Sequence, residues 1–218
     1  MTPSAPQGCR WGGDLIAAAR PWVVFDAAGL DVEIASPLGG PAAFGPMDLR
    51  DPDQSAFLGD ASMSVMLEAT IPLALIDPSR YCATWLAGGR GAMWDFPEND
   101  EIGRIGVGIL AAGGFVAAVG HGGAGLLSLL DEQGEPLVRG RRVTAFSDRE
   151  ERAVGRGDMA PFSLQARLEE AGAMYQEAEP WSPLSVVDGG LVTGQNPASV
   201  PTTALAVVKE LRAHRLTA

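Results

Sequence analysis

The sequence is poor in the residues that build disulfide scaffolds and metal centres. Only two cysteines, Cys9 and Cys82, and two histidines, His121 and His214, occur among 218 residues. A disulfide-rich fold is excluded, because such folds are short and dense in cysteine. Neither cysteine belongs to a C-x-x-C pair and the two histidines are far apart in the chain, so we expect no metal site.

Long apolar runs and basic residues are also scarce. No apolar run approaches the roughly 18 residues of a membrane-spanning helix. Lysine and arginine number 16 against 27 aspartates and glutamates, which gives a net charge of -11. This charge argues against nucleic acid, whose phosphates require a basic face, and against anionic membranes. The chain does not begin with a basic segment followed by an apolar one, so we predict no signal peptide and a cytoplasmic location.

Helical and strand patterns alternate along the chain and predict an α/β fold. Helices are expected over residues 15–28, 57–69, 99–112, 124–130, 161–171 and 199–212, strands over 31–35, 81–87, 115–119 and 142–146, and a hairpin over 186–193. This order predicts one flavodoxin-like, doubly wound domain over residues 1–218, with a mostly parallel sheet and helices on both faces. Residues 1–10 do not resemble an opening strand. The first strand is therefore expected to be degenerate or missing, or the true start lies upstream of Met1.

Two glycine-rich turns follow predicted strands. They read Gly88-Gly-Arg-Gly91 and Gly120-His-Gly-Gly123. Ligands of parallel sheets bind beyond the carboxyl ends of the strands, so these turns are the first candidates for a functional site. Neither turn is a G-x-G-x-x-G motif, and the chain has no P-loop and no flavin or nicotinamide signature. We therefore expect a protein without a cofactor.

Six segments, taken together, resemble one known family. They are Ala35-Ser-Pro-Leu-Gly-Gly40, Asp77-Pro-Ser-Arg-Tyr81, Gly88-Gly-Arg-Gly-Ala-Met-Trp-Asp-Phe-Pro97, Val116-Ala-Ala-Val-Gly-His-Gly122, Arg142-Val-Thr-Ala-Phe146 and Thr193-Gly-Gln-Asn-Pro-Ala-Ser199. Their order and spacing are similar to those of the glyoxalase III and heat-shock-chaperone branch of the ThiJ/PfpI superfamily, relatives of class I glutamine amidotransferases. The resemblance covers about residues 12–212.

The resemblance implies a nucleophile at a sharp turn between a strand and a helix, where family members read A-V-C-H-G. The matching position here is Gly120, which has no side chain to form a covalent adduct, so we expect neither a cysteine-dependent glyoxalase nor a cysteine-dependent protease. His121 matches the neighbouring histidine, and Glu151 matches its acidic partner. A glutamate on the first helix contacts the thiol in that branch, and Ala17 occupies its position.

The resemblance also assigns the residues around this centre. Gly88 and Gly89 match a turn whose backbone N–H stabilises an oxyanion, together with an N–H just after the nucleophile. Arg90 follows this turn, where relatives often carry histidine. Trp94 lies in the same motif and is expected to line the pocket. The resemblance further implies a homodimer.

Three functions are compatible with these residues. The first, which we favour here, is a cofactor-independent, non-cysteine enzyme acting on a small carbonyl-containing metabolite as a hydratase, lyase, isomerase, cyclase or hydrolase. His121 would be its acid or base and Glu151 would orient it. The second is a non-catalytic homodimeric binding, chaperone or regulatory protein. The third is glyoxalase-like activity through a substitute nucleophile such as Cys9. Cys82 begins a predicted strand and is expected to be buried in the core.

Overall fold

The computed structural model describes residues 13–45, 47–155 and 160–217, with side chains described as far as His214. Its centre is a four-stranded sheet in the order β3-β4-β8-β7. The strands are β3 (Ala83–Leu86), β4 (Phe115–Val119), β7 (Ser185–Asp188) and β8 (Leu191–Gly194). β3, β4 and β8 run parallel, and β7 pairs antiparallel with β8 through the predicted hairpin. The α/β fold with a mostly parallel sheet is therefore confirmed.

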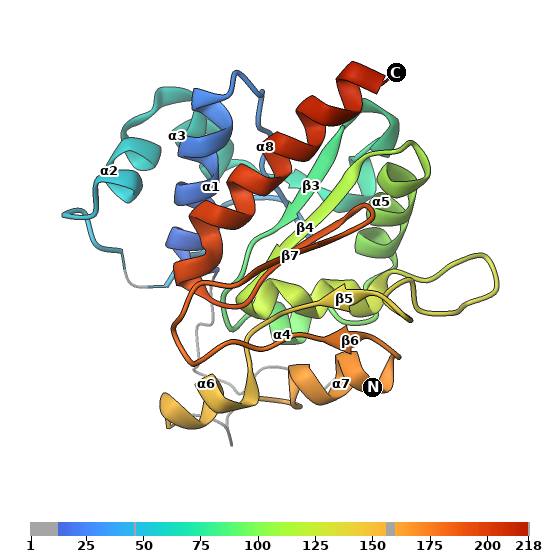
Figure 1. The fold of residues 1–218 in the computed structure, drawn as a ribbon. Coiled ribbons are helices and arrows are strands. Elements are labelled where there is room, and N and C mark those ends of the chain that lie inside the picture. The colour runs from blue at the N-terminus through green and yellow to red at the C-terminus, as the bar shows by residue number, and fades with distance from the viewer. Residues whose placement is uncertain (1–12, 46, 156–159, 218) are drawn as a thin grey trace.

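Strand β4 is buried along its whole length because helices cover both faces of the sheet. Its side chains alternate, as the pleat of a strand requires. Phe115 and Ala117 pack with residues of α1 (Leu15–Ala27) and α8 (Val200–Thr217). Val116 and Ala118 pack in a second cluster with Ile102 of α5 (Asp100–Ala111). Figure 1 shows α1 and α8 together on one side of the sheet and α5 on the other.

Side-chain caps begin the helices that cover the sheet. The Asp14 carboxylate accepts a hydrogen bond from the Ile16 N–H, and the Asn99 amide oxygen accepts from the N–H groups of Glu101 and Ile102. Such caps satisfy N–H groups that have no partner within the helix. The predicted helices at 15–28 and 99–112 are thus confirmed to within about one residue at each end.

The remaining elements surround this core. They are β1 (Ala35–Ser36), β2 (Ile71–Pro72), β5 (Arg142–Val143), β6 (Met174–Tyr175), α2 (Pro52–Gly59), α3 (Ala61–Glu68), α4 (Ala92–Asp95), α6 (Asp148–Ala153), α7 (Leu164–Glu170), and the 3-10 helices η1 (Leu73–Leu75), η2 (Pro78–Arg80), η3 (Gly120–Ser128) and η5 (Pro197–Ser199). β1 pairs with β2 and β5 with β6, each in parallel. Within the described ranges, no helix is both long and apolar enough to cross a membrane.

Several predicted boundaries are wrong. The strand expected over 31–35 forms only at Ala35–Ser36, and the strand expected over 142–146 is only two residues long. The helix expected over 57–69 is two helices, because Asp60 is extended and its carboxylate caps the second. The helix expected over 124–130 is the 3-10 helix η3, which begins earlier. The prediction for the first strand lies in residues 1–10, outside the described residues.

Candidate functional site

The centre of the site is the sharp turn that joins β4 to η3. Gly120 begins η3 with φ +58°, a left-handed conformation that favours glycine. Among the described residues, and apart from its chain neighbours, the atom nearest to a Cβ placed on Gly120 is the Gln195 carbonyl oxygen, 4.0 Å away. These residues therefore leave room above Gly120 for a side chain or a ligand. This is the sharp turn between a strand and a helix at which the resemblance places a nucleophile, and its role stays a prediction.

The turn at Gly88 and Gly89 packs directly against this centre. A Cβ on Gly88 would lie 2.7 Å from the Val119 carbonyl oxygen and 3.7 Å from the His121 nitrogen. Gly89 has φ +128°, and a Cβ there would lie 2.5 Å from the Asp14 nitrogen. The Asp14 N–H also donates to the Gly88 carbonyl at 2.9 Å. The start of α1, the glycine turn and the β4–η3 turn thus meet at the carboxyl end of the sheet.

Gly122 allows the turn after β4 to pack closely against the end of β3, and substituting it is expected to destabilise the fold. A Cβ on Gly122 would collide with the backbone carbonyl of Leu86, so Gly122→Ala should lower the free energy of unfolding by about 2–3 kcal/mol through overpacking. Gly59→Ala is the matched control, because a Cβ on Gly59 meets nothing within 4 Å. Denaturant unfolding of both variants measures the difference. Equal stability of the two would contradict this close approach.

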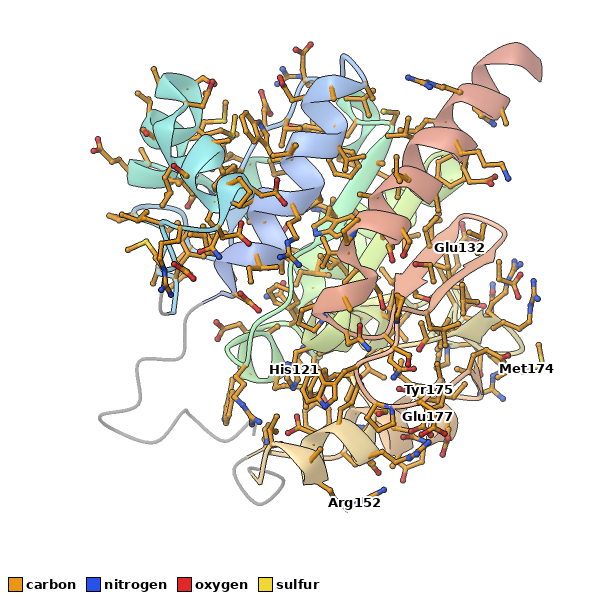
Figure 2. The ribbon with its side chains drawn as sticks, turned by 60° about the vertical axis from the view of Figure 1, so that its left-hand side comes forward. His121, Glu132, Arg152, Met174, Tyr175 and Glu177 are labelled. Atoms are coloured by element: carbon orange, nitrogen blue, oxygen red, sulfur yellow. The ribbon has the colours of Figure 1, made fainter. Side chains whose placement is uncertain are left out.

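His121 stands beside Gly120 and is held by Glu151 of α6. A hydrogen bond of 2.6 Å joins its Nε2 to Glu151 Oε1, and Arg90 Nη2 donates to Glu151 Oε2 at 2.8 Å. Each of the three side chains is only 12% exposed. Arg90, Glu151 and His121 therefore form one hydrogen-bonded row that joins the motif after β3, helix α6 and the turn after β4. Figure 2 shows His121 on the side of the sheet where α6 lies, with Arg152 of α6 pointing away from it.

The charges around Glu151 determine which ring nitrogen of His121 carries a hydrogen. Burial acts to raise the pKa of the Glu151 carboxyl, but the hydrogen bond and charge of His121 and the charge of Arg90 outweigh it. The Glu151 pKa therefore lies below its ordinary 4.5. An ionised carboxylate only accepts hydrogen bonds, so His121 Nε2 carries a hydrogen. Nδ1, for which the described residues supply no hydrogen-bond partner, is then the nitrogen available for proton transfer.

The lowered pKa of Glu151 predicts a pH-dependent contribution to stability. The pKa of Glu151 in the folded state lies below its unfolded value near 4.5. The stabilising contribution of the ionised Glu151 to the free energy of unfolding is therefore complete above about pH 5, and it is lost as the pH falls through the folded-state pKa. The stability difference between the wild type and Glu151→Gln should thus be largest at pH 7 and shrink toward pH 3.5. Denaturant unfolding across this range measures it, with the exposed Glu170→Gln as control. A difference that is constant with pH would contradict the ion pair.

The predicted site residues fall into two groups. Gly88, Gly89, Arg90, Gly120, His121 and Glu151 lie together at the turns described above. Ala17 is buried in α1, three residues after the Asp14 cap, and its carbonyl accepts a hydrogen bond from Trp85 Nε1 at 2.8 Å. Trp94 packs against the core cluster that contains Leu86 and Ala118. Its predicted place in the pocket wall stays a prediction.

The two cysteines differ in position. Cys82 is exposed, so its expected burial is wrong. It precedes β3, at the end of the sheet opposite the site, because Gly88 follows the other end of the same strand. Cys9 lies outside the described residues.

Sequence reasoning missed three residues near His121. Phe146 stacks on its imidazole, with ring centroids 4.5 Å apart. Trp181 contacts Phe146, and Glu150 is fully buried beside Glu151. The pattern Ser147-Asp-Arg-Glu150 was a detectable signal, because Ser followed three residues later by Glu marks a capping box.

A cavity of about 440 Å³ lies away from this site. It is lined by Gly113 and Gly114 before β4, by the hairpin turn at Gly189 and Gly190, and by other residues that include Arg141, but by none of the predicted site residues. It therefore belongs to the amino end of β4, where parallel sheets do not usually bind substrates. Among the described residues, no group of three or more His, Cys, Asp or Glu side chains is placed to hold a metal ion.

Comparison with known proteins identifies the family. No family model matches the chain. Glyoxalase 3 of Candida albicans is 31% identical over 215 residues, which cover 92% of this chain and 90% of that protein. The chain belongs to the glyoxalase III branch of the ThiJ/PfpI superfamily. The glutathione-independent glyoxalase HSP31 of Saccharomyces cerevisiae is 30% identical, covering 94% and 91% of the two chains.

Solved structures agree with this family. Rapid Encystment Protein 24 kDa of Francisella tularensis superposes with a TM-score of 0.91 at 32% identity, covering 95% of this chain and 93% of that one. Glyoxalase III of Candida albicans gives a TM-score of 0.85 at 28% identity, covering 94% and 91%. A ThiJ/PfpI domain protein of Brachyspira murdochii, at 17% identity and a TM-score of 0.66, shares the fold. The homodimer and the cytoplasmic location stay predictions.

The relatives overturn the function that the sequence favoured. Two proteins similar over more than 90% of this chain are named glutathione-independent glyoxalases, and a third is named glyoxalase 3. They indicate glyoxalase activity instead of a cysteine-free hydratase, lyase or hydrolase. Ruling out a cysteine-dependent glyoxalase from Gly120 alone was also unsupported. The third function considered above, glyoxalase chemistry with another nucleophile, agrees better with these relatives.

Proposed function

We propose that the protein is a glutathione-independent glyoxalase, which converts a small 2-oxoaldehyde and water into a 2-hydroxy acid. The observation that carries this proposal is the hydrogen-bonded chain Arg90–Glu151–His121 beside the open turn at Gly120. This arrangement offers a histidine with a fixed tautomer next to a site with room for a carbonyl carbon. The names of the relatives supply the reaction class.

The reaction needs one nucleophile and one proton carrier. A thiolate adds to the aldehyde carbon and forms a hemithioacetal. A base then removes the hydrogen from this carbon and returns a proton to the neighbouring carbon, so the first carbon is oxidised and the second reduced. The resulting thioester is hydrolysed by water, which releases the hydroxy acid and regenerates the thiolate. The balance closes without an added oxidant, reductant or glutathione.

We assign the proton transfer to His121 Nδ1. Glu151 holds the other ring nitrogen and thereby acts as a positioning residue, and Arg90 keeps the Glu151 carboxylate ionised. The oxygen of the substrate becomes negative when the thiolate adds. Backbone N–H groups at Gly89 and His121 are the donors that we propose for this oxyanion, because the two turns touch there.

We assign the thiol to Cys9. The chain has two cysteines, and Cys82 lies at the opposite end of β3 from the site. Cys9 is four residues before Gly13, and four residues of chain span at most about 14 Å. Gly13 itself packs against Gly89: a Cβ on Gly89 would lie 2.7 Å from the Gly13 Cα. The short separation in sequence between Cys9 and Gly13 is therefore compatible with this assignment.

The test is a turnover assay with methylglyoxal in the absence of glutathione, in which lactate is measured as the product. We expect lactate to form at a rate proportional to enzyme concentration. The folded state of each preparation is checked by thermal unfolding. A folded protein that forms no 2-hydroxy acid from methylglyoxal, glyoxal or phenylglyoxal would overturn the proposal.

A further inference from the structure

Glu150 is a completely buried carboxylate with no role in the mechanism above. It is 0% exposed, and four hydrogen-bond donors surround it. Its Oε2 accepts from the Ser147 N–H and hydroxyl, both at 3.1 Å. Its Oε1 accepts from Trp181 N at 2.9 Å and Asn196 Nδ2 at 2.8 Å. Capping α6 requires only the Ser147 contacts, so the bonds to Trp181 and Asn196 serve another purpose.

Trp181 is held in an unfavourable backbone conformation. Its φ is +65°, and within the described residues only Glu98 is another non-glycine with positive φ. A bulky residue adopts this left-handed conformation only where its surroundings enforce it. The Ser182 N–H donates to the Glu179 carbonyl at 3.0 Å and closes a turn that places Trp181 at its third position, where φ is positive. The Trp181 N–H bond to the buried Glu150 ties this turn to α6. Strained residues of this kind concentrate at functional sites.

The ring of Phe146 lies between the Trp181 indole and the His121 imidazole and contacts both. The Trp181 indole meets Phe146 edge to face, with centroids 5.7 Å apart at 64°. Phe146 in turn lies on the imidazole of His121, 4.5 Å away and tilted by 31°. The two consecutive glutamates of α6 therefore act on the same histidine from two directions. Glu151 holds its Nε2 atom directly, and Glu150 supports the face of its ring through Trp181 and Phe146.

We propose that Glu150 and Trp181 are positioning residues that restrict the rotation of the His121 imidazole. A ring confined on one face keeps its Nε2 on Glu151 and its Nδ1 turned to the substrate. Freeing the ring lowers the fraction of molecules in the reactive orientation. The kinetic part of this inference rests on the proposed glyoxalase function, whereas the orientation of His121 does not.

Trp181→Gly tests the inference, because glycine accepts the positive φ and the fold should persist. We expect kcat for methylglyoxal to fall about 5–10-fold with KM nearly unchanged, since substrate contacts are kept. Trp181→Phe keeps a ring against Phe146 and should restore most of the rate. Glu98→Gly, which relaxes the other strained residue, should leave kcat unchanged. Wild-type kcat in Trp181→Gly would overturn the proposal.

Glu150 is tested by two substitutions with different expected outcomes. In Glu150→Gln the amide oxygen can still accept from Trp181 and Asn196, while its NH₂ can donate to the Ser147 hydroxyl and only the bond from the Ser147 N–H is lost. This variant should keep at least half of kcat. Glu150→Ala removes every acceptor and should reproduce the loss seen in Trp181→Gly. Equal kcat in the two variants would count against the inference.

A measurement on the imidazoles separates this inference from the proposed function. The chain has only two histidines, so their side-chain nitrogens are readily assigned by NMR. His214, which contacts Phe115 near the far end of β4, is the internal reference. Trp181→Gly should shift and broaden the His121 resonances and leave those of His214 in place. Unchanged His121 resonances would overturn the inference even if the enzyme is a glyoxalase, and a change without any turnover would overturn only the function.

Discussion

His121→Ala is expected to lower kcat for methylglyoxal by about 10²–10⁴-fold, the range found when a general acid–base group is removed. KM should change little, because the proposed oxyanion donors are backbone groups that remain. The variant should also stay folded. Glu151 loses its bond to Nε2 but keeps its ion pair with Arg90 at 2.8 Å, so no buried charge is left without a partner.

His214→Ala is the matched control for this experiment. His214 is exposed, and its ring packs against Phe115 with centroids 6.4 Å apart. The substitution removes the other histidine of the chain, which contacts β4 at the end far from the site. Turnover should remain at the wild-type level. If His121→Ala retained more than a tenth of kcat, the assignment of the proton transfer to His121 would be wrong.

The sequence predicted which candidate residues lie together better than it predicted the lengths of the elements around them. The glycine turns and the strand at 115–119 have local patterns that tertiary packing does not change. Glu151 was found from a motif alone, and the structure joins it to His121 instead of its neighbour Glu150. Burial was harder to predict, because Cys82 adjoins an apolar strand yet is exposed at its start. Strand lengths also failed at residues 31–35, of which only Ala35 belongs to the two-residue strand β1.

Contacts between distant segments could not be predicted from local patterns. Trp181 and Phe146 are 35 positions apart in the sequence and meet only in the folded chain. The left-handed φ of Trp181 belongs to the turn that the Ser182 N–H closes on the Glu179 carbonyl, and the bond from the Trp181 N–H joins this turn to Glu150, which is 31 positions away. The function was misjudged for a different reason. One missing side chain at Gly120 was taken to rule out glyoxalase activity, which the names of the relatives indicate.

The second large effect concerns the thiol. Cys9→Ser is expected to lower kcat on the order of 10³-fold or more, because a serine hydroxyl is not ionised at neutral pH and is a poor nucleophile without a dedicated base. Cys82→Ser should keep wild-type activity, since Cys82 is exposed at the opposite end of β3. Comparing the two variants on methylglyoxal tests the Cys9 assignment. Full activity in Cys9→Ser would show that this thiol is not the nucleophile.

A thiol introduced at position 120 tests whether the chemistry takes place at the turn after β4. Adding Gly120→Cys to Cys9→Ser places a thiol beside His121, where the nearest atom to its Cβ is 4.0 Å away. The positive φ costs a non-glycine residue roughly 1–2 kcal/mol, which a stable fold tolerates. We expect kcat to rise at least about 10-fold above Cys9→Ser, because the oxyanion donors and His121 need only a correctly placed nucleophile. Gly29→Cys is the control, with a similar φ of +73° and open space but no site nearby. Recovery in both variants would mean that any added thiol suffices, whereas recovery in Gly120→Cys alone places the chemistry at the turn after β4.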